Sequence, residues 1–128
     1  MRARVEVTHE AGVVAVSLHG ETTLMASLEA VIRGVWNARK AGTRNVLFDL
    51  RESTSEDFES RVLKQASEAS RTGIGAYRVA VVGRTDDPRL PYIEEVGATR
   101  GYTVRCFVDR EAALAWLREA GSEPATAA

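Results

Sequence analysis

Hydrophobic and polar residues alternate strictly near both ends of the chain, whereas the middle holds short, continuously apolar runs. The alternation over residues 1–8 is typical of an edge strand with one buried face. Residues 103–108 alternate in the same way and predict the opposite edge, with Cys106 pointing inward. The runs at 46–50 and 79–82 predict interior strands. A further strand at 13–18 follows a short turn at 9–12, so the first two strands are expected to form an antiparallel hairpin.

Four segments have the spacing of amphipathic helices, at about 28–42, 53–73, 91–98 and 109–121. The second has a capping-box signature, Ser53-x-x-Glu56, at its start. Pro91 suits the first position of the third helix, and Asp109 suits the N-cap of the last. The first helix carries an i, i+3, i+4, i+7, i+8 apolar stripe made of Leu28, Val31, Ile32, Val35 and Trp36.

The resulting order, ββαβαβαβα, predicts an α/β fold with one domain over residues 1–121 and a loose C-terminal tail over 122–128. We expect a five-stranded mixed sheet in the spatial order 1-2-3-4-5, with the first strand antiparallel at the edge. Right-handed crossovers would gather most helices over one side and leave the other partly open, available to a homodimer or partner. The expected core residues are Leu28, Val31, Ile32, Val35, Phe48, Val81, Leu114 and Leu117, and the expected open face comprises Ala15, Ser17, Asn45, Leu47, Asp49, Arg78, Ala80 and Val82.

Composition narrows the functional classes. The chain has 128 residues with 17 basic and 18 acidic side chains, a net charge of −1 that argues against general nucleic-acid binding. No apolar run approaches the roughly 20 residues of a membrane helix, so no membrane insertion is expected. The first residues have no signal-peptide core, and the single cysteine forms no internal disulfide; a cytoplasmic location is the expectation.

Motifs for catalysis, metal binding or cofactors are not evident in the sequence. Glycine-rich phosphate loops are missing, and His9 and His19 have no neighbouring nucleophile pattern. The acidic pairs at 86–87 and 94–95 are interpreted as ordinary surface charge, and Cys106 as an unreactive core thiol. We therefore expect no enzyme activity, no metal and no cofactor.

One loop stands out, at residues 49–57 after the third strand. Ser53, Thr54 and Ser55 are three consecutive hydroxyls at a predicted helix N-terminus. Such an end stabilises a phosphate through free N–H groups and the helix dipole, but the same side chains also serve as helix caps. Both interpretations remain open at this point.

The chain resembles the STAS fold of anti-sigma-factor antagonists and, more closely, the small bacterial STAS/CRAL-TRIO-like (SpoIIAA-like) proteins. The resemblance spans about residues 3–119 and depends on the order and spacing of its parts. Those parts are the strand and turn at 13–21, the strands at 46–51 and 77–83, and the strand and helix at 104–117.

The resemblance implies a non-catalytic regulatory or scaffolding module that binds a protein partner through the region of the third strand and second helix. In antagonist STAS domains this region carries an Asp-Ser-Ser-Gly motif with a phosphorylated serine; this chain has Asp57-Phe58-Glu59-Ser60 instead, so Glu59 would supply a fixed negative charge. The CRAL-TRIO side implies, alternatively, a lipid or small apolar ligand. An enzyme with an unrecognised site is the third hypothesis. The candidate residues for partner or phosphate contact are Asp49, Arg51, Ser53, Thr54, Ser55, Asp57 and Glu59.

Overall fold

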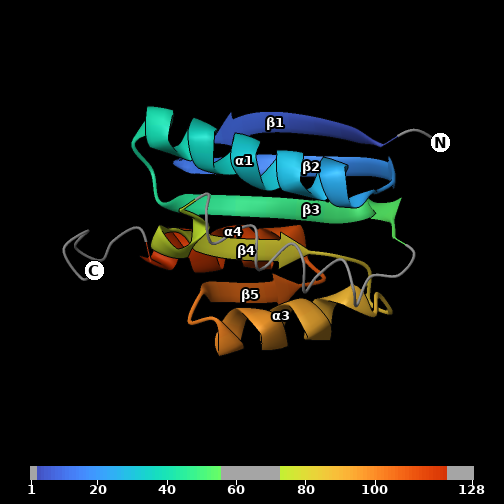
Figure 1. Ribbon diagram of the computed structural model, residues 1–128. Helices are drawn as coiled ribbons and strands as arrows, with labels where there is room; N and C mark the ends of the chain where they lie inside the picture. Colours follow the sequence, from blue (N-terminus) through green and yellow to red (C-terminus); the bar gives the residue numbers. More distant parts are fainter. Residues whose placement is uncertain (1–2, 56–72, 121–128) are drawn as a thin grey trace.

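The computed structural model describes residues 3–55 and 73–120, which form a five-stranded sheet with helices on both sides (Figure 1). The strands lie side by side in sequence order; β1 is antiparallel to β2 and every other pair is parallel. This confirms the predicted sheet order and the antiparallel first edge. The elements are β1 (Arg4–Glu10), β2 (Val13–Glu21), α1 (Leu24–Ala41), β3 (Asn45–Thr54), the short 3-10 helix η1 (Ile74–Ala76), β4 (Arg78–Val82), α3 (Arg89–Thr99), β5 (Thr103–Phe107) and α4 (Arg110–Ala120).

Several predicted boundaries differ from those of the structure. His9 belongs to β1 and not to the turn, and Val108 lies beyond the end of β5 and is 53% exposed instead of pointing inward. Helix α3 begins at Arg89, two residues before Pro91. Asp109 does accept a hydrogen bond from the Glu111 amide (3.2 Å), as expected of an N-cap. The predicted helix at 53–73 falls largely in residues 56–72, outside the described residues, as does the tail at 122–128.

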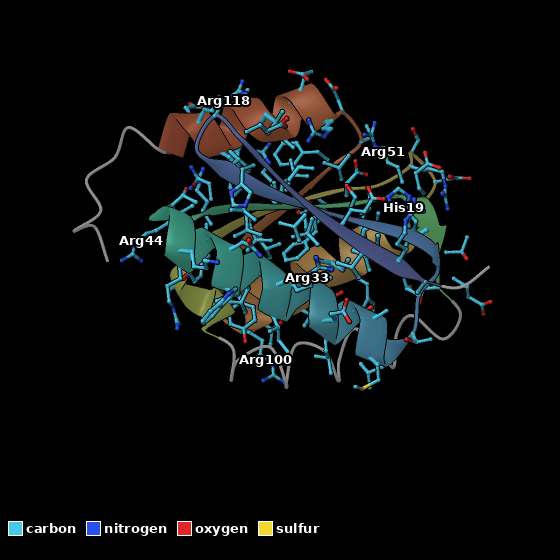
Figure 2. The ribbon with its side chains drawn as sticks, turned by 90° about the horizontal axis from the view of Figure 1, so that it is seen from above. His19, Arg33, Arg44, Arg51, Arg100 and Arg118 are labelled. Carbon is cyan, nitrogen blue, oxygen red and sulfur yellow. The ribbon has the colours of Figure 1, made fainter. Side chains whose placement is uncertain are left out.

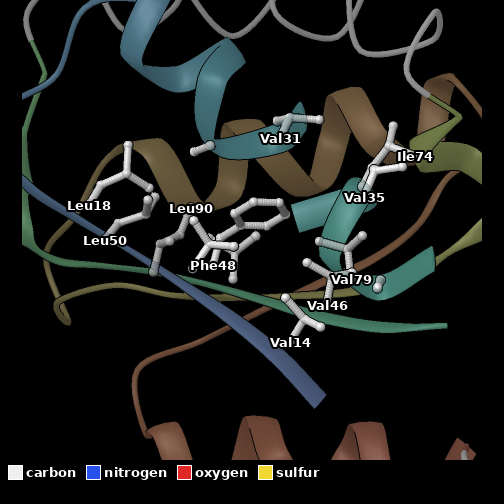
Figure 3. Close-up of a cluster of buried hydrophobic side chains, with 14 residues drawn as sticks. Val14, Leu18, Val31, Val35, Val46, Phe48, Leu50, Ile74, Val79 and Leu90 are labelled. Carbon is white, nitrogen blue, oxygen red and sulfur yellow. The ribbon is translucent and has the colours of Figure 1, made fainter. Parts of the chain in front are cut away.

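The first core lies between the sheet and the helices α1 and α3 (Figure 3). Gly34 brings α1 close to the sheet, because a Cβ at this position would lie only 3.2 Å from Val46 Cγ1 and 3.3 Å from Phe48 Cζ. The side of α1 that contacts the sheet therefore consists of small and β-branched residues. The core comprises Val14, Val16, Leu18, Ala30, Val31, Val35, Ala38, Val46, Phe48, Leu50, Ile74, Val79, Val81 and Leu90.

The centring of α1 corrects part of the predicted core. Val31 and Val35 are buried as expected, but Leu28 is only half-buried, and Ile32 and Trp36 are 54% and 58% exposed. The apolar stripe of this helix is wider than the surface it packs against. Because Gly34 makes the contact, the side of α1 that carries Ile32 and Trp36 turns away from the sheet.

A second core on the opposite side of the sheet overturns the prediction of a partly open face. Helix α4 covers this side, as the view from above shows (Figure 2). Its Leu114 and Leu117 pack against Leu47, which is fully buried. The crossover rule applies only to a helix that joins two parallel strands. Since α4 follows the last strand, it is free to cover the other side. The second core comprises Val13, Ala15, Leu47, Ala80, Val82, Ala113, Leu114 and Leu117.

Candidate partner-binding site

The carboxyl end of β3 differs from a regular strand because it contains a β-bulge. Ser17 of β2 lies opposite Asp49, but His19, two residues later, lies opposite Glu52, three residues later. The additional residue in β3 bends the strand and redirects its side chains, as bulges near functional sites commonly do. After the bulge, β3 continues through four residues, Arg51–Thr54, which we call the β3 end.

Ser53 lies in this strand and does not cap a helix, so the capping-box interpretation of Ser53 is wrong. Its side chain is only 1% exposed, and its hydroxyl donates to the Leu50 carbonyl oxygen at 2.8 Å. The buried guanidinium of Arg89 donates to the same hydroxyl at 3.2 Å and to the Ser53 carbonyl at 3.1 Å. The Ser53 hydroxyl is thus engaged on both its donor and acceptor sides, inside the protein.

Arg89 is held in turn by Asp87, and this pair is the most deeply buried ion pair within the described residues. The Arg89 Nη2 to Asp87 Oδ2 distance is 2.7 Å, and Arg89 Nε donates to Oδ1 at 3.0 Å. Burial raises the pKa of Asp87, but the hydrogen bonds from Arg89 and its positive charge outweigh this and lower the pKa. Asp87 was interpreted from the sequence as surface charge, which is wrong; Asp86 beside it is exposed.

The β3 end is also held from its two neighbouring elements. The backbone N–H and the hydroxyl of Thr22 both donate to the Thr54 carbonyl, at 2.8 and 2.9 Å. From the β4–α3 loop, Arg84 Nη2 donates to the Ser53 carbonyl at 3.3 Å. Thr22 thus binds the Thr54 carbonyl oxygen from one side of the strand, and Arg84 binds the Ser53 carbonyl oxygen from the other. The β3 end is consequently held in place beyond the point where the β4 ladder stops.

Asp49 and Arg51 form a second ion pair, on the α4 side of the sheet. Arg51 Nη2 lies 2.8 Å from Asp49 Oδ2, and the Arg51 amide donates to Oδ1 at 3.1 Å. Arg110 of α4 approaches the same carboxylate at 4.0 Å. Burial raises the pKa of Asp49, but the hydrogen bonds from Arg51 and the charges of Arg51 and Arg110 lower it by more. The pKa of Asp49 is therefore below its ordinary value. Asp49 is therefore a permanently charged anchor for Arg51 at neutral pH.

The structure brings together some of the predicted site residues. Asp49 and Ser53 are buried anchors, whereas Arg51 and Thr54 are exposed and Ser55 is half-buried. Asp57 and Glu59 lie outside the described residues. The structure adds Thr22, Arg84, Asp87 and Arg89, which sequence reasoning missed. The only signal for the last two was an Asp-x-Arg spacing before a helix, which has no specific meaning without the neighbouring strand.

Both histidines lie in strands, His9 in β1 and His19 in β2, whereas Cys106 is packed inward as its alternation predicts. His19 is half-buried, and its Nε2 lies 3.6 Å from Glu6 Oε2; Figure 2 shows it at the same end of the sheet as Arg51. Cys106 packs against the first core, and burial together with Glu94 raises its pKa to about 12.

Within residues 3–55 and 73–120, no group of three His, Cys, Asp or Glu side chains is arranged to hold a metal ion. No helix there is both long and apolar enough to cross a membrane.

Comparison with known proteins identifies the fold. The structure is similar to that of an anti-sigma factor antagonist from Mycobacterium paratuberculosis, with a TM-score of 0.60 and 20% identity over 91% of this chain and 95% of that one. An uncharacterised DUF3478 protein with a SpoIIAA-like fold from Shewanella loihica gives 0.58 and 18%, over 90% and 93%. The anti-sigma factor antagonist SpoIIAA in its unphosphorylated form gives 0.59 and 14%, over 90% and 98%.

The chain thus has the SpoIIAA-like, or STAS, fold that its sequence resembles. No family model matches the sequence, and neither does any curated protein. At these identities the similarity establishes the fold. Function must be argued from the chain's own residues.

Proposed function

We propose that this protein is a non-catalytic regulatory module that binds a protein partner through the β3 end. The observation that carries the proposal is the combination of exposure and rigidity at this place. Arg51, Glu52 and Thr54 present exposed side chains, while the backbone beneath them is fixed by Arg84, Arg89 and Thr22.

A surface that is already ordered binds with a smaller entropy loss than a loop that must first fold. The β3 end meets this condition, since buried hydrogen bonds hold Ser53 beneath the exposed side chains. It also offers both signs of charge, on Arg51 and Glu52, which is suited to recognising a polar protein surface by complementary charges. Two of the structural neighbours are anti-sigma factor antagonists, which supports a regulatory role of this kind.

A phosphorylation switch at this site would have to use a hydroxyl other than that of Ser53. The Ser53 side chain is buried and bonded to both Leu50 and Arg89. Thr54 is exposed at the end of the strand, so it is the better acceptor among residues 53 and 54. A phosphate there would add about −1.5 to −2 charges beside Glu52 and change partner choice by charge.

The alternative, binding of a lipid or small apolar ligand in the core, has less support. Helix α1 approaches the sheet so closely at Gly34 that one methyl group would contact Val46, Phe48 and Val16 within 3.3 Å. On the same side of the sheet, Gly97 of α3 approaches Val104 of β5 even more closely. A ligand site generally needs several hundred Å³. Neither contact leaves room for one between these helices and the sheet.

Site-specific photo-crosslinking in the native host tests the proposal. A photo-reactive phenylalanine analogue replaces Thr54 in one variant, Glu52 in a second and Arg44 in a third. Arg44 is also exposed but precedes the opposite end of β3, which makes it a matched control. We expect one crosslinked protein, identified by mass spectrometry, from positions 52 and 54 and not from 44.

The purified partner then allows a quantitative test by isothermal titration calorimetry. Arg51→Glu and Glu52→Lys should each weaken binding at least about tenfold, because a reversed charge in an interface costs more than 1.4 kcal/mol. Arg44→Glu should leave binding unchanged. The proposal is wrong if the crosslinks at 44, 52 and 54 are the same, or if no protein is captured at 52 or 54.

A further inference from the structure

Helix α1 carries three large apolar side chains that are each more than half exposed. Met25 is 75% exposed, Trp36 58% and Ile32 54%. We call these three residues the α1 ridge. Exposed apolar side chains scattered singly need no explanation, whereas three on the outer side of one helix are the kind of surface found at docking sites.

The ridge is the outermost line of its layer. At 100° per residue, Met25, Ile32 and Trp36 lie about 180°, 160° and 200° around the helix from Gly34. Gly34 is the point at which α1 touches the sheet. A helix packed beside α1 in the same layer would contact its flank, roughly 90° from Gly34. The occupant of the ridge must therefore approach from outside the fold.

Basic side chains border the ridge on both sides. Arg39 lies on one flank, and Lys40 and Arg33 lie on the other, all within about 80° of the ridge centre by the same helical geometry. The acidic side chain on this outer surface of α1 is Glu29, and it is paired with Arg33 at 3.6 Å. The outer surface of α1 thus carries excess positive charge around an apolar line.

We propose that the α1 ridge docks on an anionic membrane surface, with α1 lying parallel to the bilayer. A convex line of Met, Ile and Trp inserts into a planar headgroup layer without requiring a complementary groove. Flanking Arg and Lys side chains extend to the lipid phosphates while their stems stay against the apolar region, and their positive charges are attracted to an anionic surface. The ridge is separate from the β3 end, so either proposal can fail without the other.

Co-sedimentation of the full chain with lipid vesicles tests this proposal. The probes are phosphatidylcholine vesicles with and without 30 mol% phosphatidylglycerol, at about 50 and 500 mM NaCl. We expect binding only with phosphatidylglycerol, and at least about tenfold weaker binding at the higher salt because the Debye length shortens from ~14 to ~4 Å. Trp36→Ala should weaken binding at least about tenfold. Val108→Ala, which truncates an exposed apolar residue away from α1, should not.

Charge variants and fluorescence supply independent measurements. Arg39→Glu with Lys40→Glu should abolish binding, whereas Arg118→Glu on the opposite layer should not. Trp36 emission should shift to the blue on adding the anionic vesicles, and a Trp36→Phe variant, which remains able to fold, should lose that shift.

Several results would overturn the proposal. These are no binding to either vesicle, equal binding to both, or binding unaffected by the Trp36 and Arg39/Lys40 variants. Concentration-dependent dimerisation in analytical ultracentrifugation that is lost in Trp36→Ala, without vesicle binding, would instead assign the ridge to a second copy of the chain and equally overturn it.

Discussion

The Arg89 guanidinium donates a 3.2 Å hydrogen bond to the Ser53 hydroxyl across 36 residues of sequence, and both side chains are buried. This contact joins the start of α3 to the bulged end of β3. We expect Ser53→Ala to lower the free energy of unfolding by about 1–3 kcal/mol, because it leaves a buried guanidinium N–H without its acceptor. Urea denaturation followed by circular dichroism measures the change.

Thr54→Ala is the matched control for Ser53, since the neighbouring side chain has the same hydroxyl but is exposed. It should change stability by no more than about 0.5 kcal/mol. Equal effects of the two substitutions would mean that the Ser53–Arg89 contact contributes nothing to the fold.

The Asp87–Arg89 pair should make stability depend on pH in the acidic range. Asp87 has a pKa below its ordinary value of 3.8, so its contribution is complete above that value and is lost as the pH falls through the native pKa. At pH 7, Asp87→Asn should cost about 3–5 kcal/mol, because Arg89 stays buried without its counter-charge. The gap between wild type and variant should narrow below about pH 4.

Asp86→Asn is the control for this pH dependence, because Asp86 is adjacent and exposed. Its unfolding free energy should follow that of the wild type from pH 7 to pH 3. A constant difference between Asp87→Asn and wild type over the same range would contradict the role assigned to the carboxylate.

Two apolar residues exchange roles between sequence expectation and structure, and they give a direct test of the two-sided architecture. Leu47 is fully buried under α4, whereas Ile32 is 54% exposed. Leu47→Ala should cost about 2–5 kcal/mol. Ile32→Ala, which removes atoms that are largely in water, should cost less than about 1 kcal/mol. If Ile32→Ala lowered the unfolding free energy more than Leu47→Ala in urea denaturation, the burial of Leu47 under α4 would be contradicted.

The sheet order was predictable because strand patterns depend on local alternation and on the handedness of crossovers. The alternation at 1–8 and 103–108 identified both edges correctly. The position of α4 was not predictable in this way, since no later strand constrains a terminal helix. Its own apolar face, with Leu114 and Leu117, was recognised, but the sequence does not say which side of the sheet it meets.

The candidate site was only partly predictable, and the β-bulge is the physical reason. The Ser53-x-x-Glu56 spacing matches a capping box, yet the additional residue of β3 extends the strand through Thr54 and turns Ser53 into the interior. Bulges have no reliable sequence signature. Arg89 and Ser53 are 36 positions apart, so their contact depends on the tertiary fold alone.

Cys106 should react slowly with thiol reagents. Its pKa is raised to about 12 by burial and by Glu94, and its Sγ donates to the Leu90 carbonyl at 3.3 Å. The thiolate is the reactive form, so at pH 8 its labelling by Ellman's reagent should be on the order of a thousand times slower than in the unfolded chain. Rapid stoichiometric labelling of the folded protein, with guanidinium giving no further acceleration, would contradict this.

Helix α3 packs very closely against strand β5 at Gly97 and Val104. A Cβ on Gly97 would lie 2.0 Å from Val104 Cγ1, a separation that requires the helix or the valine to move. Gly97→Ala should therefore cost about 1–3 kcal/mol despite the better helix propensity of alanine. Gly75→Ala, where the nearest contact is an ordinary 3.4 Å to Tyr102, should be tolerated.

The double variant separates a steric effect from a backbone effect. Val104→Ala removes the methyl group that Gly97→Ala would meet, so Gly97→Ala should cost less in the Val104→Ala background than in the wild type. The coupling between the two substitutions should be about 0.5–3 kcal/mol, as is typical of residues in contact. It is measured as a double-mutant cycle of urea denaturation curves. Strictly additive effects would show that Val104 does not limit how closely α3 packs on β5.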